Sequence, residues 1–262
     1  MLLFDEQLIS RRFGLAARHY DAVAGIQQEM IQQALSMLNS YPISPDIILD
    51  IGCGTGNAFY GLTKKYPNSH KLAIDIAEPM LQVAQKKHPD WQLICTNMMT
   101  LPFKNAYSDF MFSTAALQWA NDTVKTLAEW YRVLRPGGYL CLGTFGENTL
   151  SELKHAFRAV DDHPHVHTFL SAAQLQNLID QVGFVTIHKI QYDRKMYHST
   201  FFEILHYLKT IGATLAAPNR RTALTGKKRF QQAAHAYEQY REAEGLPASW
   251  EIILLLLRKP EK

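Results

Sequence analysis

The ten residues from Ile47 to Gly56, IILDIGCGTG, are the stretch of this chain that most directly predicts chemistry. Three glycines at alternate positions, Gly52, Gly54 and Gly56, follow an apolar run that contains Asp50 near its end. Glycine lets the main chain approach a ligand closely because no Cβ intervenes, and it tolerates a positive φ. A carboxylate beside the turn disfavours a pyrophosphate and suits a ligand with a cationic amino group. The stretch therefore predicts a binding turn for a phosphate-free, nucleoside-like ligand.

A second carboxylate, Asp75, ends the next apolar run, 19 residues after Gly56. A carboxylate at this position is typical of ribose recognition, because it can accept hydrogen bonds from both hydroxyl groups. The glycine spacing is not the G-x-G-x-x-G of dinucleotide folds, and no Lys-Ser/Thr pair follows, which argues against a P-loop. A nucleoside with a cationic amino-acid tail and no phosphate is S-adenosylmethionine. We expect this cofactor, and the alternative is a glycine turn that serves only helix–sheet packing.

The elements that must position these residues alternate between strand and helix. Strand patterns occur at 46–51, 71–75, 91–95, 108–113 and 138–144, and helical patterns occur at 57–65, 78–88 and 122–134. Such alternation predicts an α/β fold, a doubly wound, mostly parallel sheet with helices on both faces. Two later strand patterns, at 184–192 and 250–258, would bring the sheet to seven strands. In such a sheet, ligands bind beyond the carboxyl ends of the strands.

The whole chain, 1–262, is predicted to form a single domain. Two helices within 5–38, joined by 13–21, would form an N-terminal helical cap, 1–45, before a cofactor-binding core, 46–145. The later segments are too long to be simple crossovers, so we expect them to form a helical lid over the crevice. The lid segments are 146–182 and 199–245, with closing strands at 184–192 and 250–258.

The composition favours a cytoplasmic protein with no membrane partner. The three cysteines, Cys53, Cys95 and Cys141, show no disulfide spacing, which is typical of a reducing compartment. The apolar run at 252–257 is too short to span a bilayer, and the N-terminus lacks a signal-peptide layout. Histidines alternate at 163–167, but no carboxylate cluster accompanies them, so we expect no metal.

Positive charge is concentrated in one late window, 194–230. It contains eight Lys or Arg residues against one acid, Glu203, and so carries +7, whereas the whole chain carries +3. The window is either a solvated surface or a docking face for an acidic partner.

Three segments resemble the motifs of class I S-adenosylmethionine-dependent methyltransferases. They are Leu49–Gly56, Ile74–Leu81 and Val133–Leu140. The resemblance implies a Rossmann-like fold and cofactor contacts from Tyr20, Asp50, Gly52, Cys53, Gly54, Gly56, Asp75, Ile76, Met80, Asn97, Met98 and Ser113. Asn97 departs from the pattern, because the superfamily usually carries an acidic residue there against the adenine amino group. An amide oxygen can still accept that hydrogen bond.

Five further motifs are together similar to the malonyl-acyl-carrier-protein O-methyltransferases of biotin synthesis. They are F-G-x-A-A-x-x-Y at 13–20, L-Q-W at 117–119, L-x-E-L at 150–153, P-H-x-x-x-F at 164–169 and L-K-x-I-G-A-T at 208–214. The resemblance spans roughly residues 8 to 257. It implies methylation of the free carboxylate of a malonyl thioester, with the acidic acyl carrier protein as partner.

Methylation of a carboxylate requires positioning and no catalytic base. A carboxylate with a pKa near ~4 is already ionised at neutral pH. The candidate substrate-positioning residues are Tyr20, Gln118, Trp119, Lys209, Arg220 and Arg221. The last three would bind the malonyl carboxylate or the phosphate of the carrier's phosphopantetheine arm.

Other functions remain open at the level of sequence. One alternative is that this chain is a methyltransferase for a free small carboxylic acid or another small molecule. A binding motif does not prove turnover, so a non-catalytic S-adenosylmethionine-binding protein is a further alternative. A nucleic-acid partner is not expected, because the basic residues lie in one late segment without interleaved aromatics.

Overall fold

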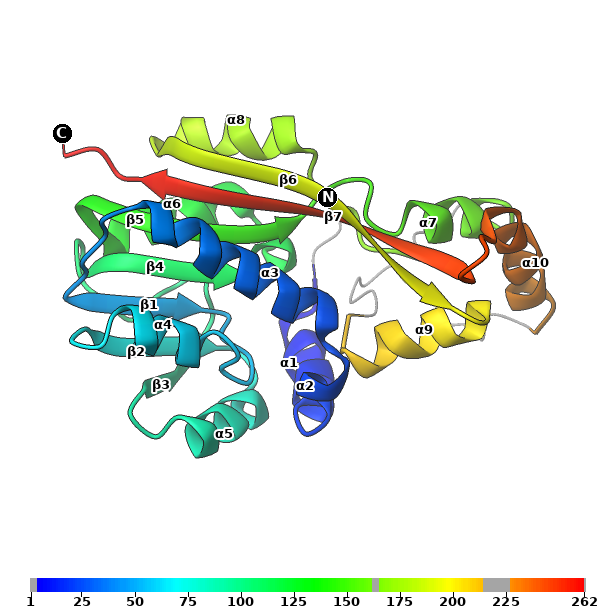
Figure 1. Cartoon of the computed structure of the whole chain (residues 1–262), viewed down its shortest axis with the longest axis horizontal. Coiled ribbons are helices and arrows are strands. Elements are labelled where there is room, and N and C mark those ends of the chain that lie inside the picture. The colour runs from blue at the N-terminus through cyan, green and yellow to red at the C-terminus, as the bar shows by residue number, and fades with distance from the viewer. Residues whose placement is uncertain (1–3, 162–164, 214–226, 262) are drawn as a thin grey trace.

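A computed structural model describes residues 4–161, 165–213 and 227–261 of the chain (Figure 1). Seven strands form one sheet in the order β3-β2-β1-β4-β5-β7-β6. The first five strands pair in parallel, and β7 runs antiparallel to both of its neighbours. The strands are β1 (Ile47–Ile51), β2 (His70–Asp75), β3 (Gln92–Cys95), β4 (Ser108–Thr114), β5 (Leu134–Phe145), β6 (Val185–His198) and β7 (Leu246–Arg258). The predicted doubly wound, mostly parallel seven-stranded sheet is therefore confirmed.

Helices cover both faces of the sheet because successive strand residues point to opposite sides. On one face, α3 (Gly25–Met37) and α4 (Phe59–Lys65) join a cluster with Ile48, Phe112 and Leu254. On the other face, α6 (Thr123–Val133) and α8 (Ala172–Val182) pack against neighbours of these residues in the strands, Leu49, Met111 and Leu255. Helix α5 (Glu78–Lys87) lies against β2 and β3.

The N-terminal cap contains three helices instead of the predicted two. They are α1 (Glu6–Ala16), α2 (Tyr20–Val23) and α3, so part of the predicted joining segment is helical. Helix α1 packs on α5 around Ala16, Ala77 and Met80, while α2 contacts α9 (Phe201–Thr210). The cap thus lies between the carboxyl end of the sheet and the later helices.

The last two strands extend well beyond their predicted bounds of 184–192 and 250–258. Strand β7 pairs with β5 only as far as Ile252, and then continues with β6 alone to its first residue, Leu246. We call this two-stranded extension, residues 193–198 and 246–251, the arm. Charged residues and Pro247 conceal it in the sequence, because they interrupt the apolar alternation that predicts a strand.

Three helices gather around the arm, as Figure 1 shows at the end of the molecule away from α5. They are α7 (Ser151–Arg158), α9 and α10 (Lys227–Tyr237). Helix α7 contacts β7 and α10, and α9 contacts β6. These helices correspond to the parts of 146–182 and 199–245 that were expected to cover the crevice.

Helix α8 is the exception to the expected lid. Leu175 and Ile179, one helical turn apart, are buried against Leu127 and Trp130 of α6. This apolar stripe places α8 in the layer that covers the sheet, whereas α7, in the first part of the predicted lid segment 146–182, contacts β7 and α10. No helix in the described part of the chain is long and apolar enough to cross a bilayer.

Candidate active site

The glycine turn lies at the carboxyl end of β1, where Gly52 and Gly54 both have positive φ, 72° and 55°. A Cβ at Gly52 would lie only 2.4 Å from the Cβ of Ala116, whereas a Cβ at Gly54 would meet nothing within 4 Å. The open side of Gly54 faces a pocket that both glycines line. The turn therefore presents bare main chain to this pocket.

Asp75 ties the end of β2 to the glycine turn. Its Oδ2 accepts a hydrogen bond from the Gly54 amide at 2.9 Å, and its Oδ1 accepts one from Ala77 at 2.8 Å. Burial raises the pKa of Asp75, while these main-chain amides lower it in part. Each carboxylate oxygen retains a lone pair, and the residue lines the same pocket as the turn.

Eight of the twelve predicted cofactor residues surround this one pocket, which we call the turn pocket. They are Tyr20, Gly52, Gly54, Asp75, Ile76, Met80, Asn97 and Met98. The structure brings them together because parallel strands end at the same edge of the sheet. Residues of α1 and α2 complete the lining of the pocket.

Four predicted cofactor residues, Asp50, Cys53, Gly56 and Ser113, do not line the turn pocket. Asp50 is 2% exposed within β1, where burial, and then the nearby Asp75 charge, raise its pKa. Ser113 is buried and donates its hydroxyl to the Ile51 carbonyl. Gly56 packs against the Phe59 ring, 2.8 Å from where a Cβ would lie. The Cys53 thiol lies 3.7 Å from the Gly54 carbonyl oxygen.

Glu6 is a pocket residue that the sequence analysis missed. Asn97 uses its side-chain oxygen to accept from the Met99 amide, and its Nδ2 donates to Glu6 Oε2 at 2.8 Å. Glu6 and Asn97 both line the turn pocket. A carboxylate therefore stands beside the position where the superfamily pattern has one, but it comes from α1, 91 residues earlier in the chain.

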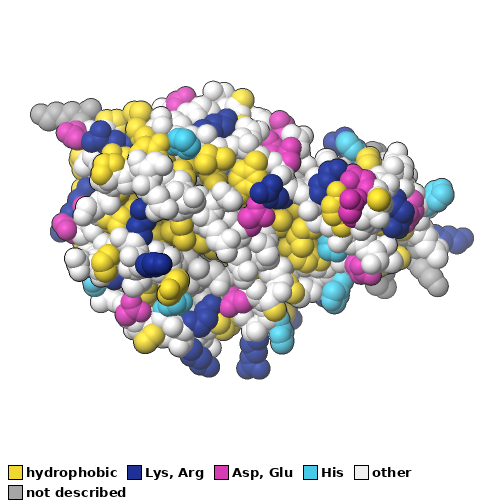
Figure 2. All heavy atoms as spheres, in the orientation of Figure 1, with side chains coloured by type: hydrophobic (Ala, Val, Ile, Leu, Met, Phe, Trp, Pro, Cys, Tyr) yellow, Lys and Arg dark blue, Asp and Glu magenta, His cyan; other side chains and the backbone are white. Residues whose placement is uncertain are grey.

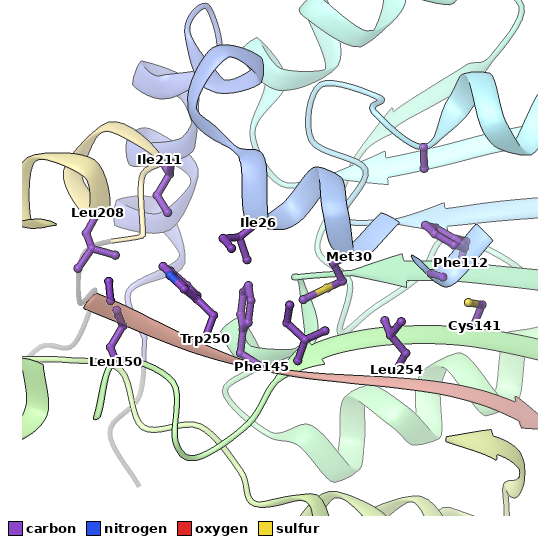
Figure 3. Close-up of a cluster of buried hydrophobic side chains, with 14 of the residues drawn as sticks. Ile26, Met30, Phe112, Cys141, Phe145, Leu150, Leu208, Ile211, Trp250 and Leu254 are labelled. Atoms are coloured by element: carbon purple, nitrogen blue, oxygen red, sulfur yellow. The ribbon is translucent and has the colours of Figure 1, made fainter. Parts of the chain in front are cut away.

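A larger cavity of about 390 Å³ adjoins the turn pocket. We call it the acceptor cavity. Phe13, Tyr20, Ala115 and Trp119 line both spaces and form the partition between them. Figure 3 shows apolar side chains converging here from separate elements: Phe145 from β5, Trp250 from β7, and Leu208 and Ile211 at the end of α9.

The partition is aromatic and well packed. The Trp119 ring meets Phe13 edge-on at 5.5 Å and stacks on His167 at 5.5 Å. Gln118 lines the cavity while its amide donates to the Ala115 carbonyl at 2.8 Å. Burial, reinforced by the charge of Asp75, raises the pKa of Tyr20 above its ordinary value, which already leaves the hydroxyl protonated at neutral pH.

Comparison with known proteins agrees with this geometry. Residues 49–142 match the family model described as a methyltransferase domain. The chain is 39% identical to malonyl-acyl-carrier-protein O-methyltransferase from Xylella fastidiosa, over 96% of this chain and 87% of that protein. The chain belongs to the malonyl-acyl-carrier-protein O-methyltransferase family. It is also 36% identical, over 98% of its length, to the biotin biosynthesis bifunctional protein BioHC from Cellvibrio japonicus, of which it spans about half, 51%.

The fold itself is shared more widely than the family. The YcgJ protein from Bacillus subtilis superposes with a TM-score of 0.60 at 18% identity, over 88% of this chain and 100% of that one. Membership of a methyltransferase family makes S-adenosylmethionine the cofactor of this enzyme. The turn pocket fits it, because bare main chain at Gly54 faces open space beside the carboxylate of Asp75.

Two cationic side chains line the acceptor cavity of this family member. Lys209, predicted from the sequence, is exposed on α9, and Arg12 of α1 was missed. Arg220 and Arg221, predicted beside Lys209, lie outside the described residues. Arg12 could have been found only by knowing that α1 folds over the crevice.

Part of the basic window is neutralised within the protein. Lys195 pairs with Glu242 at 2.5 Å, Arg229 with Asp161 at 3.6 Å, and Arg194 with Glu29. Figure 2 shows Lys and Arg side chains interspersed with Asp and Glu on the lobe around the arm. The window is therefore less available for docking than its net charge indicated. Lys209 and Lys228 are exposed and form no ion pair with a described residue.

Two described histidines, His165 and His167, line the acceptor cavity, and Nδ1 of His167 is buried without a hydrogen-bond partner among the described residues. His165 pairs with Asp161 at 2.7 Å and stacks on Phe157. His167 is 8% exposed, and burial lowers its pKa to about 4, so its ring is neutral at neutral pH. Among the described residues, no group of three His, Cys, Asp or Glu side chains could hold a metal ion.

Proposed function

We propose that this chain methylates the free carboxylate of a malonyl thioester carried by acyl carrier protein, for pimelate and biotin synthesis. The observation that carries the proposal is the partition of Phe13, Tyr20, Ala115 and Trp119 between two adjoining spaces. One space has the glycine turn and Asp75, and the other is an apolar cavity with cations in its wall. Because the same four residues line both spaces, a cofactor held in one and a carboxylate held in the other would lie side by side, as direct methyl transfer requires.

When bound, S-adenosylmethionine supplies a methyl group, which forms a bond to a carboxylate oxygen as the carbon–sulfur bond breaks and its electron pair stays on sulfur. The acceptor is already ionised, so the protein need not remove a proton. Its contribution is alignment and exclusion of water, because charge on the reactants is neutralised in the transition state. The aromatic partition and the apolar wall of the acceptor cavity perform both tasks.

Individual residues take roles that match their surroundings. Gly52 and Gly54 would receive the methionine part of the cofactor, and Asp75 the ribose hydroxyls. Asn97 and Glu6 would receive the adenine amino group. Tyr20, whose hydroxyl is protonated at neutral pH, would donate a hydrogen bond at the partition. Lys209 and Arg12 would attract the malonyl carboxylate or the arm's phosphate.

An acidic carrier would dock beside α9 and α10, where Lys209 and Lys228 are exposed. Reversal of Lys228 to Glu should raise the KM for malonyl-carrier protein, and added salt should reproduce the effect. A small malonyl thioester without the carrier should be affected much less. The matched control is Lys64→Glu, an exposed lysine on α4. An equal KM for both variants would remove Lys228 from the docking face.

The decisive experiment is mass spectrometry of malonyl-carrier protein incubated with the enzyme and S-adenosylmethionine. The proposal predicts that the malonyl-carrier protein gains the mass of one CH₂ group, and that the acetyl-carrier protein, which has no free carboxylate, gains nothing. If the enzyme methylated a free small carboxylic acid and not the malonyl thioester, its substrate would be a free acid instead of a carried malonyl group. Binding of the cofactor without transfer to any acceptor would indicate a non-catalytic protein. We also propose a cytoplasmic location, since Cys53, Cys95 and Cys141 are all free thiols.

A further inference from the structure

Three buried polar atoms of residues that line the acceptor cavity have no hydrogen-bond partner among the described residues. They are Oε1 of Gln27, Nδ1 of His167 and Nε1 of Trp250, whose residues are 7%, 8% and 2% exposed. A buried donor or acceptor without a partner is unfavourable, because it has lost its hydrogen bonds to water. A ligand that reached these atoms would satisfy them, and Gln27 and Trp250 supply one acceptor and one donor.

Gln27 occupies a position where the helix would be expected to carry an apolar residue. It lies in the first turn of α3, on the buried face that includes Ile26, Met30 and Ala34. The neighbouring residue Gln28, by contrast, uses its amide to donate to the Asp21 carbonyl at 2.7 Å. A long apolar side chain would fill the position of Gln27 without leaving an unpaired oxygen. The amide thus has no structural role that the described contacts reveal.

Trp250 lies on β7 where the arm leaves the sheet. Its ring packs on Phe145 at 5.1 Å, and Figure 3 shows Leu208, Ile211 and Ile26 grouped around the same space. Indole nitrogen can only donate a hydrogen bond. The other fully buried tryptophans satisfy this donor: Trp91 donates to Thr63 at 3.1 Å, and Trp130 to the Met98 carbonyl at 2.9 Å. Trp250 differs from both in lining the cavity with its donor unpaired.

Beside the apolar side chains of this wall, the Trp250 donor and the Gln27 acceptor are together complementary to a secondary amide. The amide carbonyl would accept from Trp250, and the amide N–H would donate to Gln27. Methylene groups on either side of that amide would contact Phe145 and Leu208. A free dicarboxylic acid has no N–H group, and at neutral pH its carboxylates can only accept.

We propose that Gln27 and Trp250 bind the amide of the thiol arm that carries the malonyl group. The recognised ligand is a malonyl thioester of an N-acylated aminothiol, the chemistry at the end of a pantetheine arm. This inference rests on the proposed function, and it identifies Gln27 and Trp250 as residues that determine substrate specificity. It explains how an enzyme that needs no catalytic base distinguishes a carried malonyl group from free malonate. The amide, two carbons from the thioester sulfur, lies within the same cavity as the reacting carboxylate.

The test compares two small substrates that differ only in this amide: the malonyl thioester of N-acetylcysteamine and S-ethyl malonyl thioester. For wild type, Trp250→Phe and Gln27→Met, kcat/KM is measured on both. Each substitution should lower the ratio of the amide-bearing to the amide-free substrate by about 3- to 10-fold, the loss of one hydrogen bond. The loss should be in KM more than in kcat.

Trp91→Phe is the matched control, because it removes the indole donor of a residue that does not line the cavity and should preserve the substrate ratio. If Trp250→Phe does not fold, as judged by thermal unfolding, Gln27→Met alone decides. A wild-type ratio in the folded variants would overturn the inference and indicate that water satisfies the two atoms. Wild-type enzyme that methylates neither thioester nor malonyl-carrier protein would instead overturn the proposed function, and the inference with it.

Discussion

Substitution of Gly54 by Ala tests whether the open side of the glycine turn is the cofactor surface. At φ 55°, an L-residue costs about 1–2 kcal/mol of stability, because its Cβ approaches its own main chain. The new methyl group would meet no protein atom within 4 Å, so little further destabilisation is expected. It would, however, stand in the turn pocket. Steric conflict there should weaken S-adenosylmethionine binding at least about tenfold, or 1.4 kcal/mol.

A control at Gly137 separates backbone strain from steric conflict with the ligand. Gly137 has φ 78°, and a Cβ there would make only ordinary contacts, the nearest 3.4 Å from Glu261. Gly137→Ala should therefore lose similar stability but retain cofactor affinity. Chemical unfolding measures the first quantity and titration calorimetry the second. Wild-type affinity in folded Gly54→Ala would refute the assignment of the turn, and an equal affinity loss in both variants would attribute it to strain.

Three further outcomes are expected. Asp75→Asn should weaken cofactor binding by on the order of 2 kcal/mol, measured by calorimetry, since a charged acceptor of the ribose hydroxyls becomes neutral; unchanged affinity would remove Asp75 from the site. Tyr20→Phe should lower the single-turnover rate without changing its flat pH profile between about 6 and 8, because an ionised carboxylate needs no base; a rate that rises tenfold per pH unit would contradict carboxylate methylation. His167 has a folded-state pKa of about 4, below its unfolded value near 6.5, so the unfolded chain binds the additional proton. Stability should fall by on the order of 3 kcal/mol as pH drops from about 6.5 to 4, and His167→Gln should flatten that part of the urea-denaturation profile.

The sequence by itself determined the sheet and much of the turn pocket. Gly52, Gly54 and Asp75 lie in consecutive strand–turn segments, and parallel strands β1 and β2 are neighbours both in the chain and in the sheet. Residues close in sequence therefore meet in space, so that a local pattern of apolar run, glycine and carboxylate is sufficient to predict them. The predicted Asp50 and Ser113 are buried within their strands and do not line the turn pocket, because alternation within a strand decides which face a side chain occupies.

Only the tertiary structure decided which residues line the acceptor cavity. Trp250 of the arm and Gln27 of α3 line the same cavity, although Trp250 follows Gln27 by 223 positions in the chain. Glu6 reaches Asn97 in the same way, because α1 folds over the end of the sheet. Local periodicity carries no information on such contacts, and a buried polar atom is recognised as unpaired only when every neighbour is known. The acceptor specificity of this protein therefore depends on packing between distant segments, whereas its cofactor depends on a motif of ten consecutive residues and one carboxylate.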